Sequence, residues 1–114
     1  MVGTESMDFG NYQWRTGHTA AYPTDKALEY LSLGLVSEAG EVAGKVKKII
    51  RDHNSELTNE LIEALELELG DVLWYIAQMC SVLKTNIGVV ANKNIEKLAL
   101  RKQANTIKGS GDSR

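Results

Sequence analysis

The sequence has very little of several features, and each shortage excludes a class of protein. Its 114 residues include one cysteine, Cys80, so no disulfide can form within the chain, which is typical of a reducing cytoplasm. The formal net charge is only −2, so we expect no general attraction to nucleic acid or to an anionic membrane. No apolar run approaches the roughly 20 residues of a membrane span, and the N-terminal segment lacks the pattern of a signal peptide. We therefore expect a cytoplasmic protein with no nucleic-acid or membrane partner.

The alternation of β-branched residues that marks strands is also missing, and Leu, Ala, Glu and Lys dominate. This composition predicts an all-α protein. We expect four helices, at about 8–18, from a cap at Thr24 or Asp25 to about 51, at 56–83 and at 89–107, with breaks at 52–55 and 85–88. Residues 1–107 are expected to form one domain, and the Gly- and Ser-rich residues 108–114 a disordered tail.

Two acidic pairs lie inside apolar segments, where a helix should carry its hydrophobic face. Glu38 and Glu41 lie within LVSEAGEV, and Glu68 and Asp71 lie within LELELGDV, at a constant offset of 30 residues. At about 100° per residue, each pair borders the apolar stripe of its helix rather than the solvated face. We interpret the repeat as two helices that present the same face to a shared site.

Buried carboxylates must be paired, protonated or bound to a metal ion, because an unpaired buried charge is costly. A cluster of oxygen ligands favours Mg²⁺, with Mn²⁺ as a substitute. The ordinary alternative is that each pair lies on the surface and that Glu41 pairs with Lys45 one turn later. Gly40 and Gly70, each next to an acid, are expected to let the two helices or a ligand approach closely.

Other metals fit the sequence less well. Di-iron bundles use Glu-x-x-His, but the residues three before His18 and His53 are Arg15 and Ile50. One cysteine and two separated histidines make no tetrahedral zinc set. An all-oxygen Mg²⁺ site remains, and Mg²⁺ commonly shares its ligands with substrate phosphates.

Basic side chains lie at positions where they could bind those phosphates. Lys45 and Lys48 follow the first acidic pair on the same helix, and Asn94, Lys97 and Arg101 share one face of the last helix. Alone, this face would be an ordinary solvated cationic surface. Beside a carboxylate–Mg²⁺ cluster, the five residues are candidates for a polyphosphate clamp.

Taken together, GLVSEAGEV with KKIIRD, then ELGDVLWY, then NIEKLALR, resemble the MazG-like nucleotide pyrophosphohydrolases of the all-α NTP pyrophosphohydrolase superfamily. Their signature is E-x-x-E, a spacer and E-x-x-D, which corresponds here to Glu38, Glu41, Glu68 and Asp71. Many members have two adjacent acids at the start of the signature, whereas Ser37 precedes Glu38 in this chain. The resemblance covers roughly residues 22–101.

The resemblance implies a MazG-type four-helix bundle that is completed by oligomerisation, as a homodimer or a homotetramer built as a dimer of dimers. It implies Mg²⁺-dependent hydrolysis of nucleoside triphosphates, often deoxynucleotides, to the monophosphate and pyrophosphate, in nucleotide-pool house-cleaning. The four signature acids would be both metal ligands and catalytic residues. For the base, the candidates are Tyr75, Trp14 and Tyr22, while Trp74 is expected in the core or an interface.

Three alternatives belong to other classes. A non-catalytic helical module would use its acidic stripes to bind a basic partner, and a structural metal binder would gain stability from metal without turnover. The D-x-D-x-D-G loop of calcium sites is absent from the sequence, which disfavours the second. A phosphatase that removes the γ phosphate would release orthophosphate instead of pyrophosphate.

Overall fold

The computed structural model describes residues 6–105, which form four α-helices and two short 3-10 turns, with no strand among them. In chain order the elements are α1 (Phe9–Thr16), η1 (Gly17–Thr19), η2 (Thr24–Lys26), α2 (Ala27–His53), α3 (Asn59–Val82) and α4 (Ile87–Asn105). The expected all-α class and the four helices are confirmed. The tail at 108–114 and the proposed domain end at 107 lie outside the described residues.

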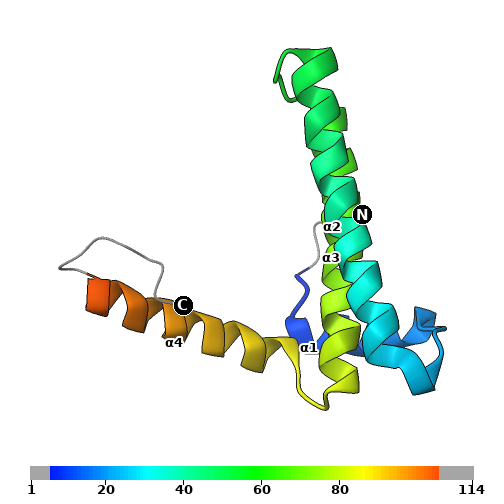
Figure 1. Ribbon diagram of the computed structural model, residues 1–114, viewed down its shortest axis with the longest axis vertical. Coiled ribbons are helices and arrows are strands. Elements are labelled where there is room, and N and C mark those ends of the chain that lie inside the picture. Colours follow the sequence, from blue (N-terminus) through cyan, green and yellow to red (C-terminus); the bar gives the residue numbers. More distant parts are fainter. Residues whose placement is uncertain (1–5, 106–114) are drawn as a thin grey trace.

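A long hairpin of α2 and α3, packed side by side, forms one arm of the molecule (Figure 1). The chain reverses at Asn54 and Ser55, whose φ angles of 55° and 62° are left-handed and end α2. The sequence placed this break at 52–55, and α2 runs on as far as His53. Leu31 and Ile49 are buried in the hairpin, so the apolar stripe of α2 does face α3.

The predicted cap of α2 is wrong, whereas α3 has a side-chain cap that the sequence did not indicate. Thr24 and Asp25 lie inside the turn η2 that follows Pro23, so α2 begins later, and its N-cap Lys26 makes no side-chain capping hydrogen bond. The N-cap of α3 is Thr58, whose hydroxyl accepts a hydrogen bond from the Leu61 backbone N–H at 3.2 Å. This satisfies one of the free N–H groups at the start of α3.

The N-terminal helix α1 packs against α3 and the start of α4. The amide of Gln13 joins these elements, because its Nε2 donates to the Thr85 carbonyl and its Oε1 accepts from the Ile87 backbone N–H, both at 3.0 Å. A small buried core is formed where α3 meets α4, by Ala77, Cys80 and Ile87.

The last helix, α4, contacts α1 and α3 but then leads away from the hairpin (Figure 1). Its apolar side chains Ile95 and Leu98 are 66% and 46% exposed. Among the described residues, none of the helices combines the length and the apolar character that a membrane crossing requires.

Candidate metal centre

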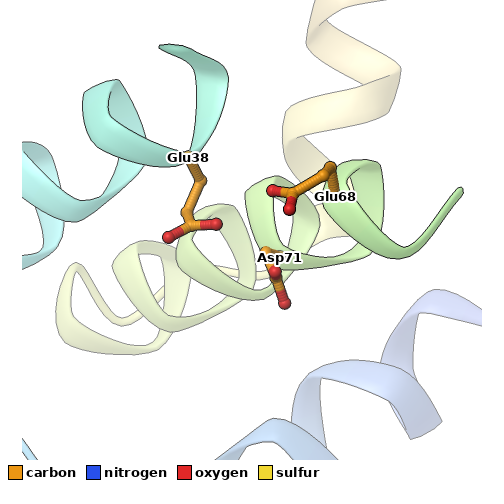
Figure 2. Close-up of side chains that lie close together, drawn as sticks. All are labelled: Glu38, Glu68 and Asp71. Atoms are coloured by element: carbon orange, nitrogen blue, oxygen red, sulfur yellow. The ribbon is translucent and has the colours of Figure 1, made fainter. Parts of the chain in front are cut away.

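Three of the four signature carboxylates converge between α2 and α3. Figure 2 shows Glu38 on α2 facing Glu68 and Asp71 on α3. One carboxylate oxygen from each residue lies within 4.8 Å of the other two. The convergence follows from the hairpin, because an antiparallel pair of helices places the first acid of one segment opposite the acids of the other.

The fourth acid, Glu41, is exposed and lies outside this group. It is three residues after Glu38, which rotates it about 60° around α2. The two acidic pairs are therefore not equivalent, since Asp71 joins the cluster and Glu41 does not. Glu41 is still close enough for its charge to act on Glu38.

The cluster carries more negative charge than the surrounding side chains neutralise. The Oε2 atom of Glu68 is buried and has no hydrogen-bond partner among the described residues. Its Oε1 lies 3.9 Å from the Nζ of Lys45, so Lys45 pairs across the hairpin with Glu68 rather than with Glu41. Burial of the side chain, followed by the charges of Asp71, Glu68 and Glu41, raises the pKa of Glu38.

These observations fit a hard divalent cation. The donors are all carboxylate oxygens, which Mg²⁺ and Mn²⁺ prefer. The single long ion pair of Lys45 with Glu68 does not neutralise three carboxylates. The buried Oε2 of Glu68 makes no hydrogen bond among the described residues, and burying a polar atom without a hydrogen bond costs free energy. A cation held by Glu38, Glu68 and Asp71 would remove both costs.

A cavity of about 420 Å³ opens beside the carboxylates and is lined by Thr19, Glu38, Asp71, Trp74 and Tyr75. Trp74, which was expected in the core or an interface, is half-buried and forms part of this wall. Its Nε1 donates a hydrogen bond to the Thr19 hydroxyl at 2.8 Å. Thr19 is a site residue that the sequence did not indicate, because nothing in its local pattern distinguishes it from other threonines.

The three aromatic candidates for base binding lie in different places. Tyr75 lines the cavity itself. Tyr22 lies behind the wall, because its ring is nearly perpendicular to that of Trp74 with the ring centroids 6.5 Å apart. The Tyr22 hydroxyl donates a hydrogen bond to Gln78 Oε1 at 2.6 Å. Trp14 is 68% exposed and lines a separate cavity of about 580 Å³. Within one chain, only Tyr75 adjoins the carboxylates directly.

Tyr12 of α1 is a second site residue that the sequence did not indicate. Its hydroxyl donates a hydrogen bond to the Gly70 carbonyl at 3.4 Å, and burial, followed by the charge of Asp71, raises its pKa. Tyr12 therefore covers the Asp71 side of the cluster. Trp14 is two residues later, about 200° around the helix, and so faces elsewhere.

The basic candidates divide into two groups. Lys45 and Lys48 lie on α2 and line a smaller cavity of about 190 Å³ toward the hairpin turn. Asn94, Lys97 and Arg101 lie on α4, which leads away from the cluster (Figure 1). A single chain thus brings Lys45 beside Glu68, places Lys48 farther toward the hairpin turn, and leaves the second group on a different arm of the molecule.

The two helices do not approach closely at Gly40 and Gly70, while the expected approach of a ligand at these glycines stays a prediction. A Cβ added at either residue would meet nothing within 4 Å. Both glycines are exposed. The close approach between α2 and α3 occurs at Gly34 instead.

The fold and the cluster define an all-helical protein with a carboxylate site suited to a divalent metal. Residues 26–105 match the family described as the MazG nucleotide pyrophosphohydrolase domain, and the chain belongs to this family. It is 44% identical over 109 residues to the Gene 37 protein of Mycobacterium phage L5, an alignment covering 90% of this chain and 96% of that protein. No solved structure matches the chain. The region that matches the family includes all four signature acids and Arg101.

Proposed function

We propose that this protein hydrolyses (deoxy)nucleoside triphosphates between the α and β phosphates, releasing the monophosphate and pyrophosphate, with Mg²⁺ as cofactor and Mn²⁺ as a substitute. The family match supports the class of reaction. The observation that carries the proposal is the convergence of Glu38, Glu68 and Asp71, with a buried Glu68 oxygen that has no hydrogen-bond partner among the described residues. We further propose a house-cleaning role in the cytoplasm, which the single cysteine supports.

In this proposal the carboxylates have two tasks. Glu38, Glu68 and Asp71 hold the cation, and Glu41, about one turn further along α2, is exposed outside this group. When bound, Mg²⁺ would neutralise the triphosphate and make water more acidic. A glutamate of the signature orients the attacking water and accepts its proton, the water oxygen bonds to the α phosphorus, and the bond to the bridging oxygen breaks, so that pyrophosphate leaves with the electron pair.

The cavity beside the cluster gives the nucleotide its orientation. Tyr75 and Trp74 form an aromatic wall on one side of the carboxylates, with Tyr22 behind it, while Lys45 and Lys48 lie on the other side. We propose that the base lies toward Tyr75 and that the β and γ phosphates extend toward Lys45 and Lys48. Trp14 remains a candidate for the base only if the nucleotide or another subunit extends as far as its separate cavity.

We propose that the protein functions as a homodimer or a homotetramer. Exposed apolar side chains occur on all three long helices, including Leu33, Val36, Leu67, Leu69, Ile95, Leu98 and Leu100. A second copy would cover such surfaces, and its α4 could supply Asn94, Lys97 and Arg101 to the triphosphate.

This assembly has a direct test. Asp71→Asn and Arg101→Ala should each be inactive alone. If α4 acts on the site of the other subunit, mixing the two variants should restore about a quarter of the unmutated activity, because half of the dimers are mixed and each has one complete site. Failure of the mixture to recover any activity, with subunit exchange verified by mass, would contradict the contribution of a second copy.

The reaction itself is tested by incubating the protein with Mg²⁺ and each of the four common dNTPs, and by measuring pyrophosphate and orthophosphate separately. Pyrophosphate alone is the expected product. Orthophosphate alone would indicate a γ-phosphatase. No release with any nucleotide would leave the non-catalytic metal-binding or protein-interaction module as the function.

A further inference from the structure

Gly34 on α2 packs directly beneath the ring of Tyr75. A Cβ placed on Gly34 would lie 2.8 Å from Cδ1 of that ring and nearer still to Cε1 and Cζ, and real Cβ atoms essentially never approach within 3.0 Å. The two other glycines of α2 that lie farther along the helix, Gly40 and Gly44, would meet nothing within 4 Å. Only a glycine at position 34 lets the Tyr75 ring lie where it does.

The ring held in this way is a wall of the proposed nucleotide site. Gly34 lies one turn before Glu38 on α2, and Tyr75 lies one turn after Asp71 on α3. The ring therefore fills the gap between the helices at the edge of the carboxylate cluster and lines the same cavity as both acids. Burial, then the charges of Tyr30, Glu38 and Asp71, raises the pKa of Tyr75, which is consistent with this position.

A side chain at position 34 would move this wall. The ring of Trp74 stands nearly perpendicular to that of Tyr75, with the ring centroids 5.1 Å apart, and both residues line the cavity, so a displaced Tyr75 ring has open space there to move into. Displacement into the cavity would narrow the space for a base. If α2 and α3 separated instead, Glu38 would move away from Glu68 and Asp71, and metal binding would weaken.

We propose that Gly34 is a positioning residue that sets the nucleotide specificity of the enzyme, because it seats the Tyr75 ring against α2 and so fixes the width of the base site. This inference rests on the proposed function, in which Tyr75 adjoins the base. It predicts that the larger purine bases are affected more than pyrimidines when the wall moves inward.

The test compares Gly34→Ala with Gly44→Ala, a half-buried glycine of the same helix with open space around it. Gly34→Ala should raise KM about tenfold, more for dATP and dGTP than for dCTP and dTTP, with kcat nearly unchanged, as expected when binding alone is lost. The rise in Tm that Mg²⁺ produces should be kept. Gly44→Ala should leave KM unchanged and raise Tm by about 4 °C, because alanine favours a helix.

A second pair of variants separates positioning from general damage. In a Tyr75→Leu background, Gly34→Ala should no longer change KM and should cost little in Tm, since the ring it displaces is gone. Equal effects of Gly34→Ala with and without the ring would overturn the proposal, as would an unchanged KM and base preference in the single variant. Loss of the Mg²⁺-dependent rise in Tm in Gly34→Ala would show separation of the helices and would also overturn it.

Failure of the proposed function gives a different result. Binding of dNTP analogues with a nitrogen at the α–β bridge is measured for the unmutated protein and for Gly34→Ala. If the unmutated protein binds none of them, both the proposed function and this inference are wrong. If it binds them and Gly34→Ala binds them equally well, only the inference about Gly34 is wrong.

Discussion

Glu68 is the carboxylate on which the account of the site depends most, because its buried Oε2 has no hydrogen-bond partner among the described residues. We expect Glu68→Gln to lower turnover by more than about 100-fold, since even the partners of metal ligands cost 10–100-fold. Without metal its Tm should rise, because one of three clustered like charges is gone. Assays with Mg²⁺ and melting curves in EDTA measure the two effects.

The neighbouring Glu66 provides the control, since it is exposed on the same helix. Glu66→Gln should change neither turnover nor the melting curve in EDTA. Retained turnover in Glu68→Gln would contradict the assignment of Glu68 as a metal ligand.

Glu38 gives a prediction about pH. Its pKa in the folded protein is raised above the ordinary value of 4.5, so the metal-free fold holds this proton more tightly than the unfolded chain does. The tighter binding of this proton stabilises the folded protein. The stabilisation is complete at pH values below the pKa of Glu38 in the unfolded chain, and it is lost as the pH rises through the raised pKa of Glu38 in the folded protein. In EDTA, Tm of Glu38→Gln minus Tm of the unmutated protein should therefore increase from pH 4.5 toward neutrality. A difference that stays constant with pH would contradict the electrostatic origin of the shift.

At the scale of residues, the sequence predicted inward-facing acids but not their exact partners. The spacing around Glu38 and Glu68 indicates two similar helix faces, and the structure brings these faces together. The spacing does not reveal that Glu41 stays outside the group of three carboxylates. The position of Glu41 depends on a rotation of about 60° around α2, and its effect depends on how the two helices pack against each other. Tyr12 and Thr19 were missed because they adjoin the site only through the packing of α1 and η1 on α3.

At the scale of elements, α3 depends on a cap that can be removed singly. Thr58→Ala removes the hydroxyl that accepts from the Leu61 N–H and should lower stability by about 1 kcal/mol. Thr24→Ala is the matched control, because Thr24 was expected to cap α2 and lies inside η2 instead. Chemical denaturation of the two variants compares them. A larger loss of unfolding free energy from Thr24→Ala than from Thr58→Ala would contradict the observed helix starts.

The helices themselves were predictable because their periodicity is local, whereas their ends and contacts were not. The turn after Pro23 takes up Thr24 and Asp25, and the residues alone do not distinguish a 3-10 turn from the first turn of an α-helix. The glycines show the same limit. Gly34, Gly40 and Gly44 look alike in sequence, but only Gly34 faces a ring on the opposing helix.

At the scale of the whole molecule, α4 links the fold to the proposed assembly. Ile87, Ala91 and Leu98 form one stripe of this helix that is buried at its start and 46% exposed at Leu98. If a second copy covers the stripe, Leu98→Glu should shift the protein to a monomer and make its Tm independent of protein concentration. Sedimentation and melting curves at several concentrations measure this.

Leu100 provides the comparison, because it is 66% exposed on the opposite side of α4. Leu100→Glu should disturb the assembly much less than Leu98→Glu. An unmutated protein that sediments as a monomer at every concentration would contradict the proposed oligomer.

We propose above all that Glu38, Glu68 and Asp71 together hold a divalent cation. Crystals grown with Mn²⁺ test it most directly, since anomalous scattering locates manganese without reference to activity. We expect an anomalous peak among these three carboxylates that disappears in Glu68→Gln. Well-ordered carboxylates with no peak between them, at millimolar Mn²⁺, would contradict it.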